Sequence, residues 1–306
     1  MAQPAPPQPL NWTVVGQGAI GLLAACRLSR HGTNVTLWLR EQRTVNVQFV
    51  AANQQSSFVF SMPSKALNAV LVPVKSYAVI SAVQQLKANL AADAQLVISH
   101  NGMPDLALLQ AQLLPSQGLW FLTTTHGAVT SGTENQIRVE HTGGGQSVLA
   151  PVNAVARLYA RQVEPAMHTA LGPVQQVEDI LPFLWHKLAV NAVINPLTAI
   201  HNCRNGELRQ PHYRRQLEAI IAEVCSVATA SGYPLDIAAT NDTVRSVMEK
   251  TAQNYSSMQQ DIYRKRQTEI DAISGFIVRQ ANKLGLNVPE NMQLQQQILQ
   301  LQQRYL

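Results

Sequence analysis

A lysine and two asparagines recur at steps of four residues in one otherwise apolar segment. Lys187, Asn191 and Asn195 lie in the stretch WHKLAVNAVINP, and on a helix they fall within roughly 80° on one face. Such a stripe is either a helix surface that faces water or a buried site whose polar groups are held for a ligand. Asparagine is a poor helix former and no acid nearby pairs with the lysine, which favours the ligand site. Pro196 is expected to kink or end this helix.

A second polar cluster lies downstream of this helix, in the stretches QNYSSM and TEID. It contains Asn254, Ser256, Ser257 and Glu269. Ser257 and Glu269 would lie about 120° apart on one straight helix. They converge only if the helix breaks between them, or if they touch different ends of a ligand.

A glycine motif near the start of the chain is typical of dinucleotide binding. Gly16–Gly21 reads G-x-G-x-x-G and lies between the short apolar strand Thr13–Val15 and the apolar helix Ala19–His31. The glycines permit a tight turn, a close approach of backbone to pyrophosphate, and packing of the helix against the strand. The helix N-terminus then faces the anion. The strand and the helix around the motif favour a dinucleotide site over a merely structural turn.

The next strand, Val35–Leu39, ends where a dinucleotide's adenosine ribose is usually bound. An acidic residue there binds the 2'-hydroxyl of NAD. Here Arg40 comes first, with Glu41 next and Arg43 nearby. Because an arginine forms paired hydrogen bonds to phosphate, we expect NADP. The alternative is that Arg40 is solvated and Glu41 binds the ribose hydroxyls of NAD.

Further polar residues follow other expected strands. Lys75 ends the strand Leu67–Val74, Asn101 follows the strand Gln95–Ser99, and the stretch TTTHGA, which ends at Ala128, follows the strand Leu119–Thr123. Ligands bind outside the carboxyl ends of such strands, so a common site is expected. No histidines have metal-ligand spacing with a third ligand, and we expect no metal. No serine lies in a nucleophile elbow, and none of the cysteines recommends covalent catalysis.

The elements that position these residues divide the chain into two domains. Residues 1–178 alternate strands with helices, including a helix from about Tyr77 to Ala91, which predicts a parallel sheet covered on both faces. Residues 136–149 carry a three-glycine turn between two short apolar runs and predict a hairpin. Residues 179–306 are mostly helical, with helices expected over the stretches 184–199, 213–231 and 291–305. Residues 1–10 are Pro-rich and are expected to form a loose tail.

Composition excludes several classes of protein. With 306 residues, 46% of them hydrophobic, the chain can bury two cores, and most of it is expected to be ordered. The net charge is +5, and residues 1–133 hold seven Lys or Arg against three acids, which favours an anionic ligand. The dense basic run at 264–266 lies between Asp261 and Glu269, so nucleic-acid binding is not expected. No signal peptide or membrane-spanning segment is apparent, and three distant cysteines fit a reducing cytoplasm. The Gln-rich last helix is either a polar surface or a face for homo-oligomer formation.

These motifs together resemble the 2-dehydropantoate 2-reductase (ketopantoate reductase) family. The similarity covers nearly the whole chain in order, and the stretch KLAVNAVINPLT, from Lys187, is highly specific to that family. The resemblance implies an N-terminal Rossmann-type domain, an all-α C-terminal domain, and NADPH-dependent reduction of 2-dehydropantoate to (R)-pantoate in pantothenate and coenzyme A biosynthesis. It also implies residue roles. Lys187 matches the family's proton donor. The positions that match substrate-binding residues of the family are Asn101, Lys187, Asn191, Asn195, Asn205, Asn254 and Ser257. The positions that match its cofactor-binding residues are Gly16, Gln17, Gly18, Ala19, Ile20, Gly21, Arg40, Lys75, Asn101, Ala128 and Glu269.

The chemistry implied for Lys187 is proton donation to a ketone oxygen. A lysine with the usual pKa of about 10.4 is protonated at pH 7, and burial would lower its pKa and ease the transfer. Glu269 either restrains the ammonium or holds the cofactor ribose. Two positions depart from the family pattern: Ala78 replaces a glutamine, and Pro104 follows the motif HNGM.

Two other functions remain open at this point. A related NADP-dependent 2-oxoacid or 3-hydroxyacid dehydrogenase would reuse the same lysine and asparagines, and a substrate panel separates it. A non-catalytic NADP(H) sensor would keep the glycine turn without turnover. The intact set Lys187, Asn191 and Asn195 argues against the sensor.

Overall fold

The computed structural model describes residues 10–52 and 54–306, and these form two compact units. The sheet unit contains the described residues through His100 together with Asp105–Ile180. The helical unit contains Asn101–Pro104 and Leu181–Leu306. The segment Asn101–Pro104 thus belongs to the helical unit, although strands of the sheet unit flank it in the sequence. The expected tail lies outside the described residues except for Leu10. That the first domain binds NADP and the second binds substrate stays a prediction.

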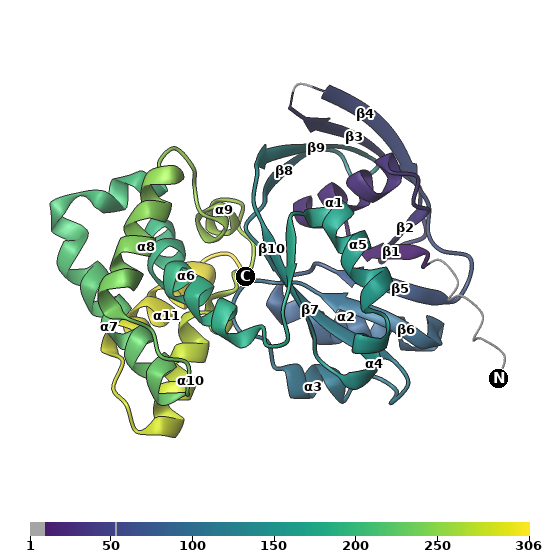
Figure 1. Ribbon diagram of the computed structural model, residues 1–306. Helices are drawn as coiled ribbons and strands as arrows, with labels where there is room; N and C mark the ends of the chain where they lie inside the picture. Colours follow the sequence, from purple (N-terminus) through teal and green to yellow (C-terminus); the bar gives the residue numbers. More distant parts are fainter. Residues whose placement is uncertain (1–9, 53) are drawn as a thin grey trace. The chain divides into compact units, whose positions relative to one another are not determined.

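A seven-stranded sheet forms the centre of the sheet unit (Figure 1). Its order is β11-β10-β7-β6-β5-β1-β2, and all neighbours from β7 to β2 are parallel, whereas β10 is antiparallel to β7. The strands are β1 (Trp12–Val15), β2 (Val35–Trp38), β5 (Leu67–Val72), β6 (Leu90–Ile98), β7 (Gly118–Thr124), β10 (Ser147–Pro151) and β11 (Val174–Gln176). The predicted parallel sheet with crossover helices is confirmed. The carboxyl ends of the neighbours β5, β1 and β2 therefore lie side by side, where a ligand binds in such sheets.

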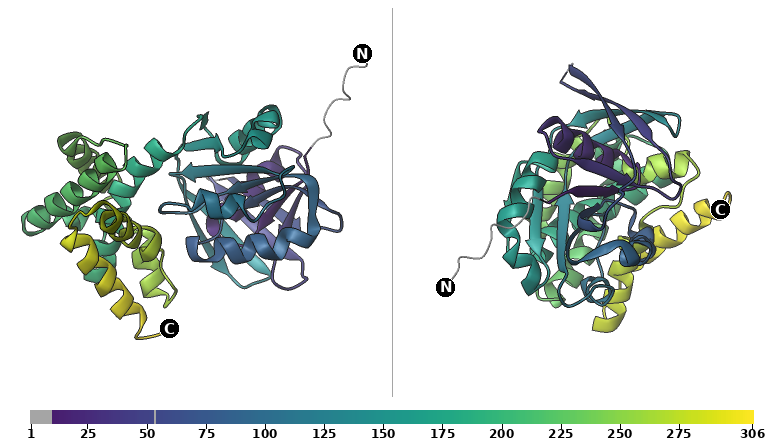
Figure 2. Two further views of the ribbon diagram at one scale, coloured as in Figure 1. Left: turned by 90° about the horizontal axis from the view of Figure 1, so that it is seen from below. Right: turned by 90° about the vertical axis from the view of Figure 1, so that its right-hand side faces the viewer.

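Helix α1 (Ala19–Arg30) lies between this sheet and a second one (Figure 2). It packs beside α5 (Ala160–Leu171) and contacts strands of both sheets. Leu22, Leu23 and Cys26 are fully buried as a result. Burial raises the pKa of the Cys26 thiol to about 12. The other helices of this unit are α2 (Val79–Leu86), α3 (Leu106–Gln110) and α4 (Ala154–Leu158).

The second sheet has four strands in the order β4-β3-β9-β8, and it was not anticipated from the sequence. The strands are β3 (Val45–Ala51), β4 (Gln54–Phe60), β8 (Gly127–Gly132) and β9 (Gln136–Gly143). Val45, Val47 and Phe49 of β3 are buried at alternate positions, as expected for a sheet that covers a core on one face. This sheet closes the core over α1.

The predicted hairpin over residues 136–149 is wrong. Its first run lies in β9, which pairs with β3 and β8, and its second run lies in β10, which pairs with β7 and β11. The glycines between them carry the chain from one sheet to the other. A side chain at Gly145 would overlap the backbone of Thr125 and His126. The glycine there permits close approach of two backbones and does not close a two-strand turn.

The helix expected from Tyr77 to Ala91 is shorter than predicted. The α-helix α2 ends at Leu86, with a 3₁₀ turn on either side, η1 (Ser76–Ala78) and η2 (Lys87–Asn89). Strand β6 already begins at Leu90, which pairs with Leu67 of β5. Pairing in the sheet therefore overrides the apolar periodicity at the end of this segment.

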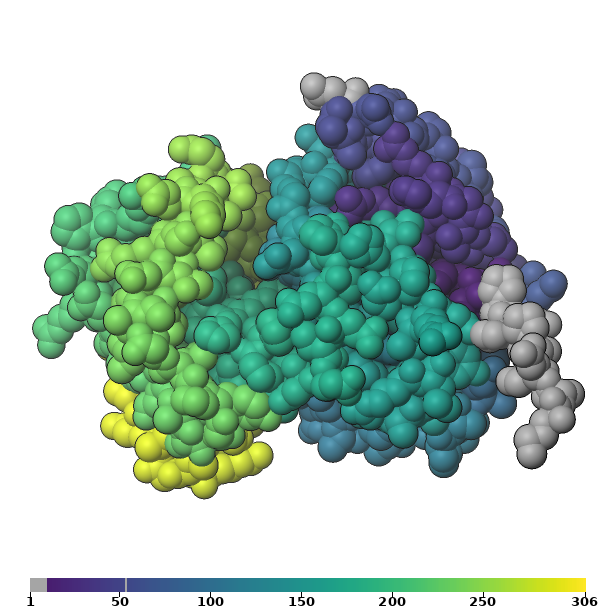
Figure 3. Space-filling model, in the orientation of Figure 1, coloured from purple at the N-terminus to yellow at the C-terminus, as the bar shows by residue number. Residues whose placement is uncertain are grey.

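The helical unit is built around α6 (Leu181–His201), which packs against α7, α8, α9 and α11. Its other helices are α7 (Arg214–Ala230), α8 (Ile237–Lys250), α9 (Ser257–Tyr263), α10 (Ser274–Leu284) and α11 (Pro289–Gln302). The three predicted helices are confirmed as α6, α7 and α11. Pro196 lies inside α6 and does not end it. In Figure 3 yellow atoms from the C-terminal part of the chain lie at the lower edge of this unit. Among the described residues no helix is both long enough and apolar enough to span a bilayer.

A pair of histidines in the sheet unit predicts a loss of stability in acid. His126 Nδ1 lies 3.1 Å from His141 Nε2, and its Nε2 lies 3.1 Å from the carbonyl oxygens of Leu171 and Gly172. Burial lowers the pKa of both rings below the ordinary 6.5, and the charge of Arg27 lowers both further. The unfolded chain therefore takes up protons first as the pH falls, so stability is lost below about pH 6.5. We expect a lower Tm at pH 5 than at pH 7.

Replacement of one ring tests this interpretation. His141→Gln removes one titrating group while keeping a side-chain donor, so the fall in Tm between pH 7 and pH 5 should become smaller. The control is His186→Gln, at an exposed position, which should leave that fall as it is. Equal pH dependence in wild type and His141→Gln would contradict the assignment.

Candidate functional site

The glycine turn of the sheet unit has the geometry of an anion cradle. Gly16 has a φ of 80°, and its amide donates to the Trp38 carbonyl oxygen at 2.8 Å, which joins the turn to β2. Gly18 is the N-cap of α1, where no side chain caps the helix and no acid lies in the first turn. A Cβ at Gly21 would lie only 2.9 Å from Pro73 Cγ. The turn therefore leaves the first amides of α1 available to an anion, and the residues present fit a pyrophosphate.

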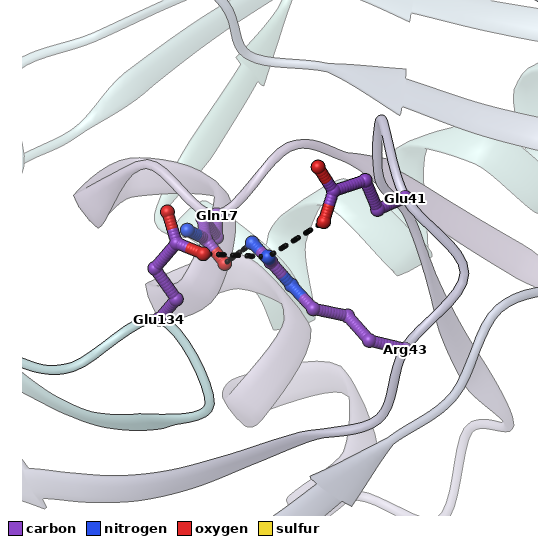
Figure 4. Close-up of polar contacts among 4 residues, drawn as sticks. All are labelled: Gln17, Glu41, Arg43 and Glu134. Carbon is purple, nitrogen blue, oxygen red and sulfur yellow. Dashed lines mark hydrogen bonds and ion pairs between the residues drawn. The ribbon is translucent and has the colours of Figure 1, made fainter.

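Charged residues surround the end of β2. Arg40 and Glu41 are exposed, and Arg43 is partly buried. Figure 4 shows Arg43 reaching toward Gln17, Glu41 and Glu134. Its Nη1 lies 2.8 Å from Glu134 Oε2 and 3.8 Å from Glu41 Oε2, and its Nη2 donates to Gln17 Oε1 at 3.2 Å.

The other cofactor positions of the sheet unit are divided between the two sheets. Lys75 follows β5 and is partly buried, so the turn after β1, Arg40 after β2 and Lys75 share the carboxyl edge of three neighbouring strands. Ala128 lies in β8 of the four-stranded sheet, opposite His141. Their roles as cofactor contacts stay predictions.

Helix α6 positions the lysine and asparagines of the helical unit. Most of its other residues between Leu184 and Ala199 are buried, although His186 is exposed. Lys187 and Asn191 are partly exposed and Asn195 is 7% exposed. Burial lowers the pKa of the Lys187 ammonium to about 8, and the charge of Glu269 opposes that decrease. The Asn191 Nδ2 atom is buried and has no hydrogen-bond partner in the described part of the chain. An unsatisfied buried donor of this kind fits a ligand oxygen.

Glu269 is held beside this helix by Asn101. Both oxygens of the carboxylate accept hydrogen bonds: Oε1 from the Asn101 amide at 3.3 Å and Oε2 from Asn101 Nδ2 at 3.1 Å. The Met103 amide also donates to the Ala272 carbonyl oxygen at 3.0 Å. These hydrogen bonds join the segment Asn101–Pro104 to the turn that follows Glu269. Glu269 itself is 5% exposed.

Asn205, Asn254 and Ser257 lie near the other end of α6. The Asn205 amide donates to the Asn254 carbonyl oxygen at 2.9 Å, and Asn205 Oδ1 is buried without a partner within residues 10–52 and 54–306. Ser257 begins α9, and the preceding Ser256 accepts from Thr198 of α6 at 2.7 Å. Helix α9 ends at Tyr263, so the chain does break between Ser257 and Glu269. Asn254 and Ser257 are exposed.

Comparison with known proteins identifies the family to which this chain belongs. Residues 12–154 match the model of the protein family described as "Ketopantoate reductase PanE/ApbA". Residues 179–302 match the model of the family described as "Ketopantoate reductase PanE/ApbA C terminal". A 2-dehydropantoate 2-reductase of Vibrio cholerae is 38% identical over 299 residues, which cover 97% of this chain and 99% of that protein. The chain belongs to the ketopantoate reductase family. Its predicted resemblance to that family is confirmed.

Solved structures have the same fold. A PanE/ApbA family ketopantoate reductase from Ralstonia eutropha has a TM-score of 0.81 at 25% identity, covering 96% of this chain and 99% of that one. D-mandelate dehydrogenase, solved with NADH and anilino(oxo)acetate, has a TM-score of 0.86 at 20% identity, with the same coverage. The predicted α/β fold with a helical second part is confirmed.

Sequence reasoning missed the contacts of Arg43. Its position three residues after Arg40 was visible, but its partner Glu134 lies in the loop between β8 and β9 of the unforeseen second sheet. A carboxylate isolated in a polar loop gives no sequence signal of its own. The orphaned amide atoms of Asn191 and Asn205 likewise emerge only from the packing around them.

Proposed function

We propose that this protein reduces 2-dehydropantoate to (R)-pantoate with NADPH, a step in the route to pantothenate and coenzyme A. Membership of the ketopantoate reductase family supports an oxidoreductase of this class that uses a nicotinamide dinucleotide. The observation that carries the proposal is Lys187, whose pKa is about 8, on the same helix as the unsatisfied Asn191 amide. A lysine with this pKa can donate a proton near neutral pH. The Asn191 side-chain amide has a hydrogen-bond donor that a substrate oxygen could accept from.

The sheet unit supplies the residues that would hold the cofactor. Gly16–Gly21 would bind the pyrophosphate, and Arg40 would bind the adenosine 2'-phosphate, which distinguishes NADP from NAD. Lys75 and Ala128 are further proposed contacts. When bound, NADPH supplies the hydride. The proposed proton donor and the proposed substrate ligands are side chains of this chain.

Lys187 is the proposed acid of the reaction. Its protonated Nζ polarises the ketone oxygen and then gives that oxygen its proton as negative charge develops there. Glu269 stabilises the ammonium electrostatically, while Asn101 holds the carboxylate through two hydrogen bonds. These contacts keep the charged form of Lys187 populated near pH 7 although burial opposes it.

The asparagines and Ser257 are the proposed binding groups for the substrate. Amides and hydroxyls bind a carboxylate or hydroxyl without adding negative charge that would repel an anionic 2-oxoacid. Asn191 Nδ2 offers an unused donor and Asn205 Oδ1 an unused acceptor. Asn195, Asn254 and Ser257 complete the proposed set.

A substrate panel tests the proposed activity. NADPH oxidation is followed with 2-dehydropantoate, with a short unbranched 2-oxoacid, and with phenylglyoxylate, the ketone related to mandelate. We expect the highest kcat/KM with 2-dehydropantoate. A clear preference for either other acid would favour the related 2-oxoacid dehydrogenase, and no oxidation with any of them would favour a non-catalytic protein.

The cofactor preference is tested at Arg40. Arg40→Asp replaces the proposed phosphate ligand with a carboxylate, so kcat/KM should fall for NADPH relative to NADH by roughly tenfold or more. The control is Arg161→Asp, which makes the same change of charge at an exposed position in α5. If the ratio of kcat/KM for NADPH to that for NADH is unchanged in Arg40→Asp, the result would favour Glu41 as the ribose ligand and NAD as the cofactor.

A further inference from the structure

We infer that Arg43 is a second phosphate ligand for NADPH, and that Glu134 occupies its guanidinium until the 2'-phosphate displaces it. This inference rests on the proposed function, because it concerns the group that distinguishes NADPH from NADH. It assigns a specificity role to Arg43, which the sequence only placed near Arg40, and to Glu134, which the sequence did not single out.

The contacts of Arg43 place its guanidinium at the adenosine side of the glycine turn. Gln17, which accepts from Nη2 at 3.2 Å, is the residue between the first two glycines. Arg43 itself follows β2, whose carboxyl end is where dinucleotide folds bind the adenosine ribose. The guanidinium therefore joins the turn after β1 to the segment after β2 (Figure 4).

One edge of the guanidinium is unsatisfied. Nη1 pairs with Glu134 and Nη2 with Gln17, whereas Nε is buried and has no acceptor among the described residues. A buried donor without a partner costs free energy, so an incoming oxygen that accepts from it gains binding. Phosphate offers several acceptor oxygens and can engage Nε and an Nη group together.

Glu134 is easily displaced from this contact. Its side chain is 76% exposed, whereas that of Arg43 is 21% exposed, so the carboxylate can rotate into water while the guanidinium stays in place. The pair holds a carboxylate that lies largely in water, where an ion pair contributes little stability. A phosphate dianion makes stronger charge-assisted hydrogen bonds than one carboxylate oxygen does.

Charge balance at this edge explains why displacement matters. Arg40 and Arg43 are offset by Glu41 and Glu134, so the four side chains carry no net charge. A phosphate arriving there meets no excess of positive charge until Glu134 leaves. Glu134 therefore lowers the affinity for NADPH, and Arg43 raises it.

Binding of two nucleotides distinguishes a phosphate-binding role of Arg43 from a purely structural role. Adenosine 2',5'-bisphosphate carries the 2'-phosphate, and adenosine 5'-monophosphate lacks it. Their dissociation constants are measured by titration calorimetry on the full chain at low ionic strength, for wild type, Arg43→Gln and Glu134→Gln. The readout is the ratio of the two constants.

A matched control comes from the opposite edge of the large sheet. Glu178 pairs with Arg157 at 3.1 Å and is 75% exposed, and it follows β11, the edge strand farthest in order from β2. Glu178→Gln therefore removes the same charge from an equally exposed carboxylate. Its ratio should equal that of wild type.

We expect opposite changes in the two test variants. Arg43→Gln should reduce the preference for the bisphosphate by about tenfold or more, and Glu134→Gln should increase it by about threefold. Equal weakening of both nucleotides in Arg43→Gln would mean that Arg43 only supports the turn, and would overturn the inference. So would a ratio unchanged in both variants. A wild-type protein without any preference for the bisphosphate would instead refute the proposed NADP specificity.

Discussion

Replacing Lys187 with alanine is expected to lower kcat for 2-dehydropantoate by about 10² to 10⁴, the usual contribution of a positioned acid. NADPH binding should remain nearly intact, because the proposed cofactor contacts do not include this lysine. Turnover and the NADPH dissociation constant are measured on the same preparation. Lys187→Arg is the informative companion, since arginine keeps the positive charge but does not give up its proton near neutral pH. Near-normal turnover in Lys187→Ala would refute the assignment.

The pH dependence of the wild type follows from the same group. Lys187 must be protonated to act as an acid, and its pKa is lowered to about 8. Activity should therefore be full below this pH and fall as the pH rises through about 8. Glu269→Gln removes the charge that raises this pKa, so the fall should move to lower pH. A shift in the opposite direction would contradict the electrostatic link between the two residues.

Gly102→Ala is expected to destabilise the helical unit strongly. Gly102 has a φ of 79°, and an added Cβ would overlap the carbonyl group of Ala272. The conformation costs about 1–2 kcal/mol for a residue with a side chain, and forced repacking adds about 1–3 kcal/mol. The same displacement would pull Asn101 away from Glu269. We therefore expect a lower free energy of unfolding together with reduced turnover.

A second glycine, Gly232, distinguishes the cost of backbone strain from the cost of steric overlap. Gly232, also in the helical unit, has a φ of 89°, and a Cβ there would meet no atom within 4 Å. Gly232→Ala should show only the conformational cost, with turnover close to normal. Equal destabilisation of the two variants in denaturant titrations would show that contact with Ala272 contributes nothing.

The sequence was sufficient to predict the elements whose signals are local. The glycine turn, with an apolar strand before it and an apolar helix after it, predicted β1, α1 and β2 almost to the residue. The stripe of Lys187, Asn191 and Asn195 predicted one face of α6. In both cases the spacing of residues within a single element carries the information.

What could not be predicted depends on partners distant in the sequence. The apolar runs of β9 and β10 are compatible with a hairpin locally, and only pairing with β3 and β7 assigns them to different sheets. Strand β3 does alternate buried and outward residues, so its signal was available. Nothing local places Asn101 against Glu269, 168 residues later, because that contact depends on how the helical unit packs.

The covering of α1 by two sheets has a consequence for redox chemistry. A thiol reacts as its thiolate, and the Cys26 thiol is both shielded and kept protonated by that burial. Alkylating reagents and oxidants can therefore reach this sulfur only when the layers around α1 separate. Cys26 is in effect a built-in reporter of that opening, and its rate of modification measures how often the layers come apart.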